Sequence, residues 1–254
     1  MKELTHLSLF SGIGGLDLAA EWAGFITVGQ CESAEYPTMV LEKHWPDVER
    51  WKDIHELSAD EFYKRTGVKE ITVISGGFPC QPHSVAGLRK ASCDERDLWP
   101  EYRRVVDEIR PKWVVAENVR GLLSSEYGRF FRGILRDFAN MGYDVGWCCY
   151  RAADVGAIHA RERIAIIAHT NSQRLERVYE GQVCRWKEQS YEHSCGEVAD
   201  WQRRSNLYEP KLLRSRNGIP GYVDRIKALG NCVVPQQFYP IFKAIAKIEL
   251  EVMP

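Results

Sequence analysis

The sequence lacks several features that would narrow its function at once. Basic residues number 34 against 35 acidic ones, for a formal net charge of -1, so a nucleic-acid partner must be held by a local basic patch. No apolar run approaches the roughly 20 residues that span a bilayer, and the opening MKELTHLSLF has no leader pattern. We therefore expect a cytoplasmic protein. Internal repeats and low-complexity tracts are also absent.

A disulfide framework and a zinc pattern are missing as well. The eight cysteines show no pairing pattern, and two of them are adjacent, which favours reduced thiols. His169, Cys184, His193 and Cys195 match no common zinc spacing, so we expect no metal.

One stretch does point to chemistry: residues 71–87, with the sequence ITVISGGFPCQPHSVAG. A β-branched run predicts a buried strand, two glycines follow it, and Cys80 stands between Pro79 and Pro82. Proline fixes φ, so this loop is stiff, and loops at strand ends carry the active sites of α/β folds. The stretch alone leaves two interpretations open: a nucleophilic thiol, or a cysteine packed as a small hydrophobe.

A second candidate site begins at SGIGG, which follows an expected strand over Leu4–Phe10. The next strand, Ile26–Cys31, ends in Glu32, about twenty residues after the glycines, which is the layout by which doubly wound folds hold a nucleotide. Asp17 stands where a dinucleotide fingerprint has its third glycine. This disfavours nicotinamide and flavin and leaves an adenosine-type cofactor, or merely a tight turn with surface acids.

The rest of the chain alternates expected helices and strands, which indicates one α/β domain. From Thr170 to about Asn217 aliphatic residues are few, so we expect a loop-rich insert there. The expected elements are helices over Leu98–Ile109, Tyr127–Met141 and Phe238–Glu251, a strand over Lys112–Ala116 that leads to Glu117, a strand or hairpin arm within GYDVGWCCYRA, and a strand opened by Arg161-Glu162-Arg163.

Five stretches in order resemble the motif set of the DNA (cytosine-5) methyltransferases of bacterial or phage type: FSGIGG at 10–15, GFPCQ at 77–81, ENV at 117–119, RER at 161–163 and GNCVVP at 230–235. The resemblance implies a class I S-adenosylmethionine-dependent fold, Rossmann-like, with a mostly parallel sheet and helices on both faces. The catalytic domain would be 1–168 and 218–254, the small irregular recognition lobe 169–217, and the closing helix would pack beside the glycine turn.

The resemblance also assigns the cofactor site, with S-adenosylhomocysteine as product. Glu32 would take the ribose hydroxyls, and Asp53 and Ile54 would meet the adenine. The full set of implied cofactor residues is Phe10, Gly12, Gly14, Gly15, Leu16, Glu32, Asp53, Ile54, Pro79, Leu98, Asn231 and Val233.

The implied reaction is covalent. Cys80 would add to C6 of a flipped-out cytosine, with Arg161 and Arg163 favouring the thiolate. Glu117 would share a proton with N3 of the base, and Asn118 would hold the carboxyl loop.

Contacts to DNA are expected just past the cysteine, at Gln81, Ser84 and Arg89, although an ordinary polar loop would look the same. The insert interleaves arginines and lysines with Trp186 and Trp201, but acids nearly cancel them, so both a recognition surface and a solvated lobe stay open. His159 departs from the family, where many members carry glutamine two residues before the first arginine of this motif.

We therefore expect a methyltransferase that modifies C5 of cytosine in a short duplex DNA site. It would be encoded by a bacterium or a phage and act as a monomer on nucleoid DNA, with a possible cognate restriction endonuclease in the same system. Two alternatives remain: an RNA cytosine-5 methyltransferase acting on transfer RNA, and a catalytically incomplete DNA-binding relative that needs a partner.

Overall fold

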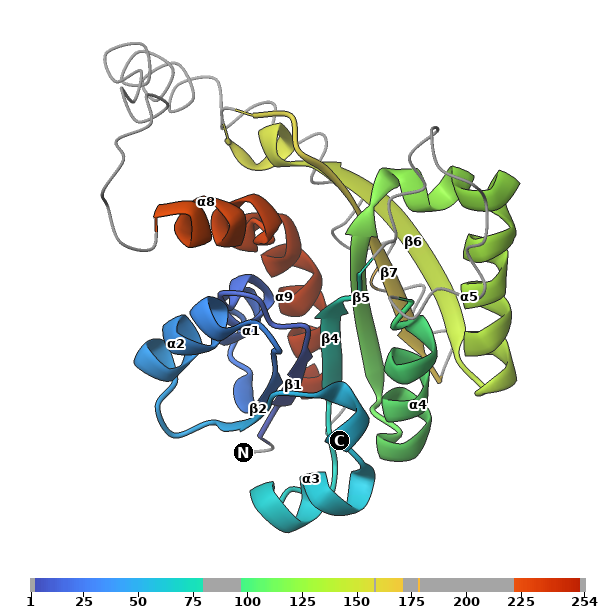
Figure 1. The fold of residues 1–254 in the computed structure, drawn as a ribbon. Helices are drawn as coiled ribbons and strands as arrows, with labels where there is room; N and C mark the ends of the chain where they lie inside the picture. The colour runs from blue at the N-terminus through green and yellow to red at the C-terminus, as the bar shows by residue number, and fades with distance from the viewer. Residues whose placement is uncertain (1–2, 80–96, 158, 171–177, 179–221, 252–254) are drawn as a thin grey trace.

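The computed structural model describes residues 3–79, 97–157, 159–170, 178 and 222–251. Cys80, Gln81, Ser84 and Arg89 lie outside this part of the chain, as does nearly all of the insert expected at 169–217. The described residues form a seven-stranded sheet with helices packed on both of its faces (Figure 1). None of their helices is both long enough and apolar enough to cross a membrane.

The sheet has the strand order β3-β2-β1-β4-β5-β7-β6. Neighbouring strands from β3 through β5 are parallel, whereas β7 runs antiparallel to both β5 and β6. The expected mostly parallel sheet is confirmed. The strands are β1 Thr5–Leu9, β2 Ile26–Cys31, β3 Glu49–Trp51, β4 Val73–Gly77, β5 Trp113–Val119, β6 Asp144–Arg151 and β7 Glu162–His169.

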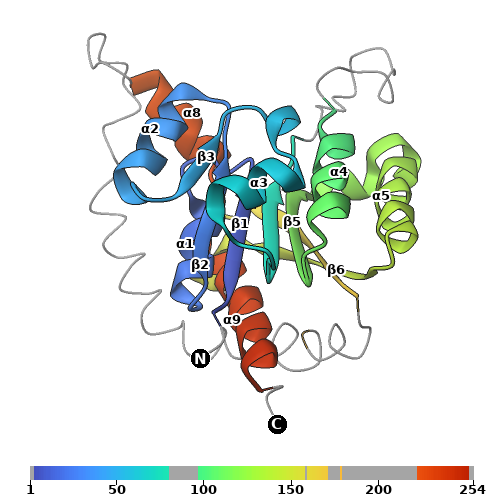
Figure 2. The same cartoon turned by 90° about the horizontal axis from the view of Figure 1, so that it is seen from below.

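Helices cover the two faces of the sheet, as Figure 2 shows from below. They close two separate hydrophobic cores. On one face Phe62, Tyr102 and Phe138 are fully buried, and on the other Phe238 and Phe242. The helices are α1 Gly15–Trp22, α2 Glu35–His44, α3 Ala59–Thr66, α4 Trp99–Ile109, α5 Arg129–Asn140, α8 Tyr222–Asn231 and α9 Pro235–Glu251, with 3-10 turns η1 Ile54–Glu56, η3 Arg120–Gly128 and η4 Ala152–Val155.

One expected helix begins later than the sequence indicated. Glu126, Tyr127 and Gly128 have φ of 49°, 56° and 78°, three consecutive residues in the left-handed region. A right-handed helix cannot include such residues, because their backbone turns the opposite way. The helix expected from Tyr127 therefore starts at Arg129.

The last helix packs against the first, as the family resemblance implied. The Trp22 ring of α1 meets the Tyr239 ring of α9 edge to face at 6.1 Å. A side chain at Gly15 would bring its Cβ to 2.5 Å from the carbonyl oxygen of Val233, so only glycine permits this approach. The segment before α9 thus lies directly on the start of α1.

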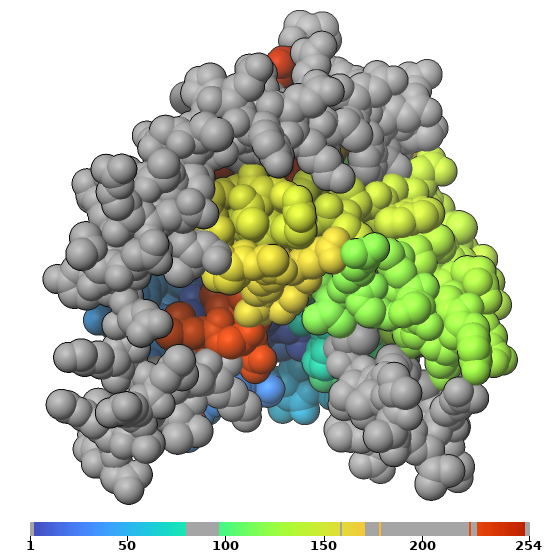
Figure 3. Space-filling model, turned by 90° about the horizontal axis from the view of Figure 1, so that it is seen from above, coloured from blue at the N-terminus to red at the C-terminus, as the bar shows by residue number. Residues whose placement is uncertain are grey.

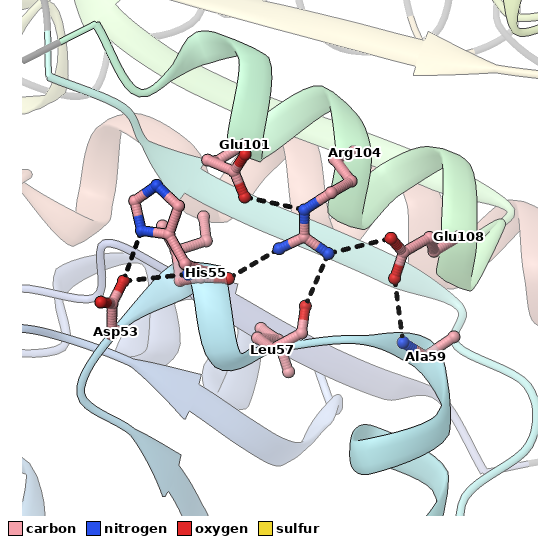
Figure 4. Close-up of polar contacts among 8 residues, drawn as sticks. Asp53, His55, Leu57, Ala59, Glu101, Arg104 and Glu108 are labelled. Carbon is pink, nitrogen blue, oxygen red and sulfur yellow. Dashed lines mark hydrogen bonds and ion pairs between the residues drawn. The ribbon is translucent and has the colours of Figure 1, made fainter. Parts of the chain in front are cut away.

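A polar clamp fixes η1, the turn that carries two expected cofactor residues (Figure 4). Arg104 of α4 donates hydrogen bonds to the carbonyl oxygens of Ile54 at 2.8 Å and Leu57 at 3.2 Å. Glu101 and Glu108 hold its guanidinium at 2.7 Å and 2.9 Å. A planar guanidinium group has several N–H donors, so it can bond carbonyl and carboxylate oxygens at the same time. Through this one side chain, α4 positions η1.

Replacing Arg104 with methionine should lower the free energy of unfolding by about 1 to 3 kcal/mol, because two carbonyl oxygens of η1 lose their donors. Urea denaturation followed by circular dichroism measures this change. Arg103→Met is the matched control on the same helix: its ion pair with Asp137 is half exposed and 3.5 Å long, so the change should stay within about 0.5 kcal/mol. Equal losses in both variants would contradict the clamp.

Candidate active site and cofactor turn

The register of the sheet brings the expected site residues to one edge. Leu9 is the Cα partner of Cys31 and of Gly76, Gly77 is the partner of Glu117, and Val119 is the partner of Arg163. Residues that follow the parallel strands therefore meet the residues that open the antiparallel β7. In Figure 3, seen from above, yellow atoms of the β6–β7 region, green atoms of η3 and red-orange atoms of α8 surround deeper blue atoms of the N-terminal segment.

The glycine turn after β1 adopts a conformation that few sequences allow. Phe10, Gly12 and Gly14 have φ of 52°, 57° and 87°. A Cβ at Gly14 would lie 2.4 Å from the ring of Trp45, so this position also requires glycine for space. The Phe10 ring stacks on Tyr102 at 6.4 Å, which holds the strained residue against the core.

Glu32 meets the glycine turn directly. Its Oε2 accepts a hydrogen bond from the backbone N–H of Gly12 at 2.7 Å, and its Oε1 accepts from Ala34 N–H at 2.8 Å. Each carboxylate oxygen has a further lone pair that can accept from a ribose hydroxyl. A Cβ at Gly12 would meet no atom of the described residues within 4 Å, so this part of the chain leaves its backbone open to close approach. These residues fit an adenosine-type cofactor.

The expected adenine contacts lie at η1. Asp53 is exposed and caps this turn: its Oδ1 accepts from the N–H of His55 at 2.9 Å and lies 2.7 Å from the His55 ring (Figure 4). The His55 hydrogen bonds hold the pKa of Asp53 below its usual value. Ile54 and Leu16 are 5% and 3% exposed, so their side chains belong to the core.

The remaining expected cofactor residues differ in burial, and one of them lies against the glycine turn. Leu98 is half-buried against the core, and Pro79 and Asn231 are exposed. Val233 is half-buried, and its carbonyl oxygen lies over Gly15, as described for the α1–α9 contact. The structure thus brings the first and the last of the five motifs into contact.

Glu117, at the end of β5, forms a buried ion pair with Arg163 of β7. The Arg163 Nε atom lies 2.7 Å from Glu117 Oε1, and the two side chains are 16% and 11% exposed. Burial raises the pKa of Glu117, and the charges of Arg163 and Arg161 partly offset that rise. Buried carboxyl groups with a raised pKa and an arginine partner are candidates for acid–base chemistry.

The other carboxylate oxygen of Glu117 lies over the end of β4. A Cβ at Gly77 would stand 2.6 Å from Glu117 Oε2, so the glycine makes room for the carboxyl group. Asn118 donates from Nδ2 to the carbonyl oxygen of Phe78 at 3.0 Å. Phe78 is itself buried against Trp99 at 5.1 Å, so the residue two positions before Cys80 is firmly held.

Arg161 connects the site to the end of α8. Its guanidinium donates a short hydrogen bond to the carbonyl oxygen of Gly230, while its Nε is buried without a partner among the described residues. Its own carbonyl oxygen accepts from Gln237 Nε2 at 3.1 Å, and the same amide donates to Tyr150 at 3.0 Å. His159, the departure from the family pattern, is exposed.

Sequence reasoning missed two residues that support this site, Arg104 and Gln237. Both act on backbone carbonyls contributed by other elements, and neither lies within a motif that the sequence singled out. Arg104 falls within the helix expected over Leu98–Ile109, whereas Gln237 precedes the helix expected from Phe238, because α9 begins earlier, at Pro235.

Among the described residues, no group of three or more histidine, cysteine, aspartate or glutamate side chains is arranged to hold a metal ion. His169 is buried at the end of β7 with its ring 4.0 Å from that of Trp113. Cys184, His193 and Cys195 lie outside the part of the chain that the structure describes.

Comparison with known proteins agrees with this geometry. The family model for C-5 cytosine-specific DNA methylases matches residues 4–216, well over half of the chain. The type II methyltransferase M.NgoMIV of Neisseria gonorrhoeae is 35% identical over 169 residues, and M.Sau96I of Staphylococcus aureus is 34% identical over 170. These matches cover 66% and 65% of this chain but 53% and 39% of the relatives, so the chain spans about half their length or less.

Solved structures share the fold. A chain described as a DNA modification methyltransferase encoded within an E. coli prophage aligns with a TM-score of 0.59 at 28% identity, over 68% of this chain and 48% of its own. The S. pombe Dnmt2 methyltransferase aligns with a TM-score of 0.55 at 21% identity, over 66% and 51% of the two chains, a likeness of fold alone.

The fold is thus that of the class I S-adenosylmethionine-dependent methyltransferases. With its motifs gathered at one sheet edge and its family model matched over most of its length, the chain belongs to the C-5 cytosine-specific DNA methylase family.

Proposed function

We propose that this protein transfers a methyl group from S-adenosylmethionine to C5 of cytosine in duplex DNA. The observation that carries the proposal is the buried pair of Glu117 and Arg163, which lies beside the end of the strand that leads to Cys80. Membership of the family supports the choice of cytosine and of DNA.

Cytosine C5 is a weak nucleophile, so the ring must first be activated. The thiolate of Cys80 adds to C6, forming a carbon–sulfur bond and moving the C5=C6 π electrons into an enamine that is nucleophilic at C5. A free cysteine is only a few per cent thiolate at neutral pH. The positive charges of Arg161 and Arg163 favour its ionised form.

Glu117 acts as the general acid in this scheme. Burial raises its pKa, which is the direction that favours a proton shared between the carboxyl group and N3 of the base while negative charge develops on the ring. Arg163 fixes one carboxyl oxygen, which leaves the oxygen over Gly77 to face the base. Asn118 positions the root of the segment that carries Cys80.

Phe10, the turn from Gly12 to Gly15, Glu32 and the backbone of η1 would hold the cofactor. When bound, S-adenosylmethionine supplies an electrophilic methyl group on a sulfonium and leaves as S-adenosylhomocysteine. Loss of the C5 proton then restores the C5=C6 bond and expels the Cys80 thiolate. None of these steps needs a metal ion.

The reaction requires the target base outside the helical stack, at a cost of a few kcal/mol that contacts to the base and phosphates offset. We assign such contacts to Gln81, Ser84 and Arg89, and the choice of DNA sequence to the insert at 169–217. We further propose a monomer that acts in the bacterial cytoplasm beside a cognate restriction endonuclease, as the type II relatives suggest.

Incubating the protein with S-adenosylmethionine labelled in its methyl group and with either duplex DNA or transfer RNA tests the function. We expect label on 5-methylcytosine in DNA. Label on transfer RNA alone would instead support the RNA methyltransferase, and the absence of label on both with DNA still bound would support a catalytically incomplete relative.

Duplex DNA that carries 5-fluorocytosine in place of cytosine should trap a covalent adduct, because fluorine at C5 prevents the final elimination. Denaturing gel electrophoresis detects the adduct as a shifted band. Cys80→Ala should form none. A band of equal intensity in that variant would mean that another residue is the nucleophile.

Glu117→Gln should lower kcat by about 10²- to 10⁴-fold, the usual contribution of a positioned general acid, while DNA still binds. Steady-state methyl transfer and a DNA gel-shift assay measure the two quantities. Glu61→Gln is the control, because Glu61 lies on α3 and pairs only with Lys64 at 3.6 Å among the described residues. An unchanged kcat in Glu117→Gln would refute the acid role.

A further inference from the structure

Asp17 is a charged residue in the middle of a buried helix face. It lies on α1 between Leu16, Ala19 and Ala20, and it is 0% exposed. Burying a carboxylate in an apolar interface is costly unless its oxygens are well bonded. Asp17 also occupies the position at which a dinucleotide fingerprint would have glycine, and none of the steps proposed above uses it.

Both oxygens of Asp17 are bonded, and to two different strands. Ser8 of β1 donates from its hydroxyl to Oδ2 at 2.9 Å, and Gln30 of β2 donates from Nε2 to Oδ1 at 2.8 Å. Ser8 and Gln30 are Cα partners in the parallel register of β1 and β2. The carboxylate of Asp17 on α1 therefore accepts hydrogen bonds from two paired residues on neighbouring strands.

The polar chain continues to a third strand and a second helix. Gln30 Oε1 accepts from Arg50 Nε at 3.0 Å, and Arg50 is the Cα partner of Gln30 on β3. The Arg50 guanidinium also donates to the carbonyl oxygens of Leu41, at 3.0 Å, and of Trp45 at the end of α2. Because Arg50 and Asp17 use opposite ends of the Gln30 amide, the orientation of that amide is fixed.

This hydrogen-bond network lies next to residues that are expected to bind the cofactor. Ser8 of β1 precedes Phe10 by two positions, and Gln30 of β2 precedes Glu32 by two positions, so each lies just before the end of its strand. Trp45, whose carbonyl Arg50 holds, places its ring against Gly14 of the turn. The same network thus supports Phe10, Glu32 and Trp45, three residues that belong to the glycine turn or contact it.

We propose that Asp17 is a positioning residue for the cofactor turn. Through Ser8, Gln30 and Arg50 it holds the carboxyl ends of β1 and β2 and the end of α2, so that Phe10 and Glu32 keep the places from which they would contact the adenosine moiety of the cofactor. The inference rests on the proposed function, because S-adenosylmethionine supplies that moiety.

The ionised form of Asp17 is the one that accepts both hydrogen bonds. Burial raises its pKa to about 6, against the opposing effects of Gln30, Ser8 and Arg50. Since this folded-state pKa lies above the ordinary value, the stability that it contributes is present at acid pH and is lost as pH rises through about 6. Measurements at pH 8 therefore observe the carboxylate.

Asp17→Asn should weaken the binding of S-adenosylhomocysteine about tenfold. The new amide must turn an N–H either towards Gln30 Nε2, itself a donor, or towards the Ser8 hydroxyl, whose hydrogen then loses its acceptor. Titration calorimetry measures the Kd, and steady-state methyl transfer should show a raised KM for S-adenosylmethionine with little change in kcat.

A second substitution supplies the rescue. In the double variant Asp17→Asn with Gln30→Glu, the amide at position 17 donates to a carboxylate at position 30, which still accepts from Arg50. Every hydrogen bond is kept with one direction reversed, so the Kd should return to within about twofold of the wild type.

The control is Thr72→Val, which removes a buried hydroxyl that accepts from the Thr5 backbone N–H at 3.2 Å on the neighbouring strand. It should lower Tm and leave the Kd for S-adenosylhomocysteine unchanged, which separates general stability from positioning.

An unaltered Kd in Asp17→Asn, or a double variant that recovers Tm but not the Kd, overturns the positioning role alone. A wild-type protein that binds no S-adenosylhomocysteine overturns the proposed function and this inference with it.

Discussion

The whole site depends on strand direction. Five parallel strands, β1 to β5, end at the same edge, and β7 adds its first residues there because it runs the other way. This reversal is what sets Arg163 beside Glu117, since a parallel β7 would carry its arginines to the far edge. Register brings four of the five motifs to this edge, and the contact of Val233 with Gly15 adds the fifth.

Two buried carboxylates, Asp17 and Glu117, lie close to this edge, and they differ in their hydrogen-bond partners. Asp17 receives neutral donors on both oxygens and reaches an arginine only through Gln30. Glu117 pairs with an arginine directly through one oxygen. An acid bonded on both sides is suited to hold elements in place, whereas an acid with one oxygen uncommitted among the described residues is suited to exchange a proton.

Local patterns in the sequence were sufficient to predict the glycine turn and its partner Glu32, because both depend on spacing and on strand period. The direction of β7 could not be predicted, because the run IAIIAH indicates a buried strand but carries no signal for antiparallel pairing. The burial of Asp17 and the clamp by Arg104 were also beyond prediction, because each depends on side chains from distant elements. The left-handed backbone at Glu126 and Tyr127 delays the start of α5, and neither residue is the glycine that would have indicated such a conformation.

The contact between α9 and the start of the chain has a consequence for how the protein is made. Gly15 lies under Val233, and Trp113 donates to Glu249 at 3.1 Å across 136 residues of sequence. During synthesis α1 therefore cannot pack against α9 until α9 has left the ribosome. Contacts between residues this distant in sequence are slow to form. A nascent chain would expose the apolar face of α1 meanwhile, which makes its early folding intermediates the species most prone to aggregate.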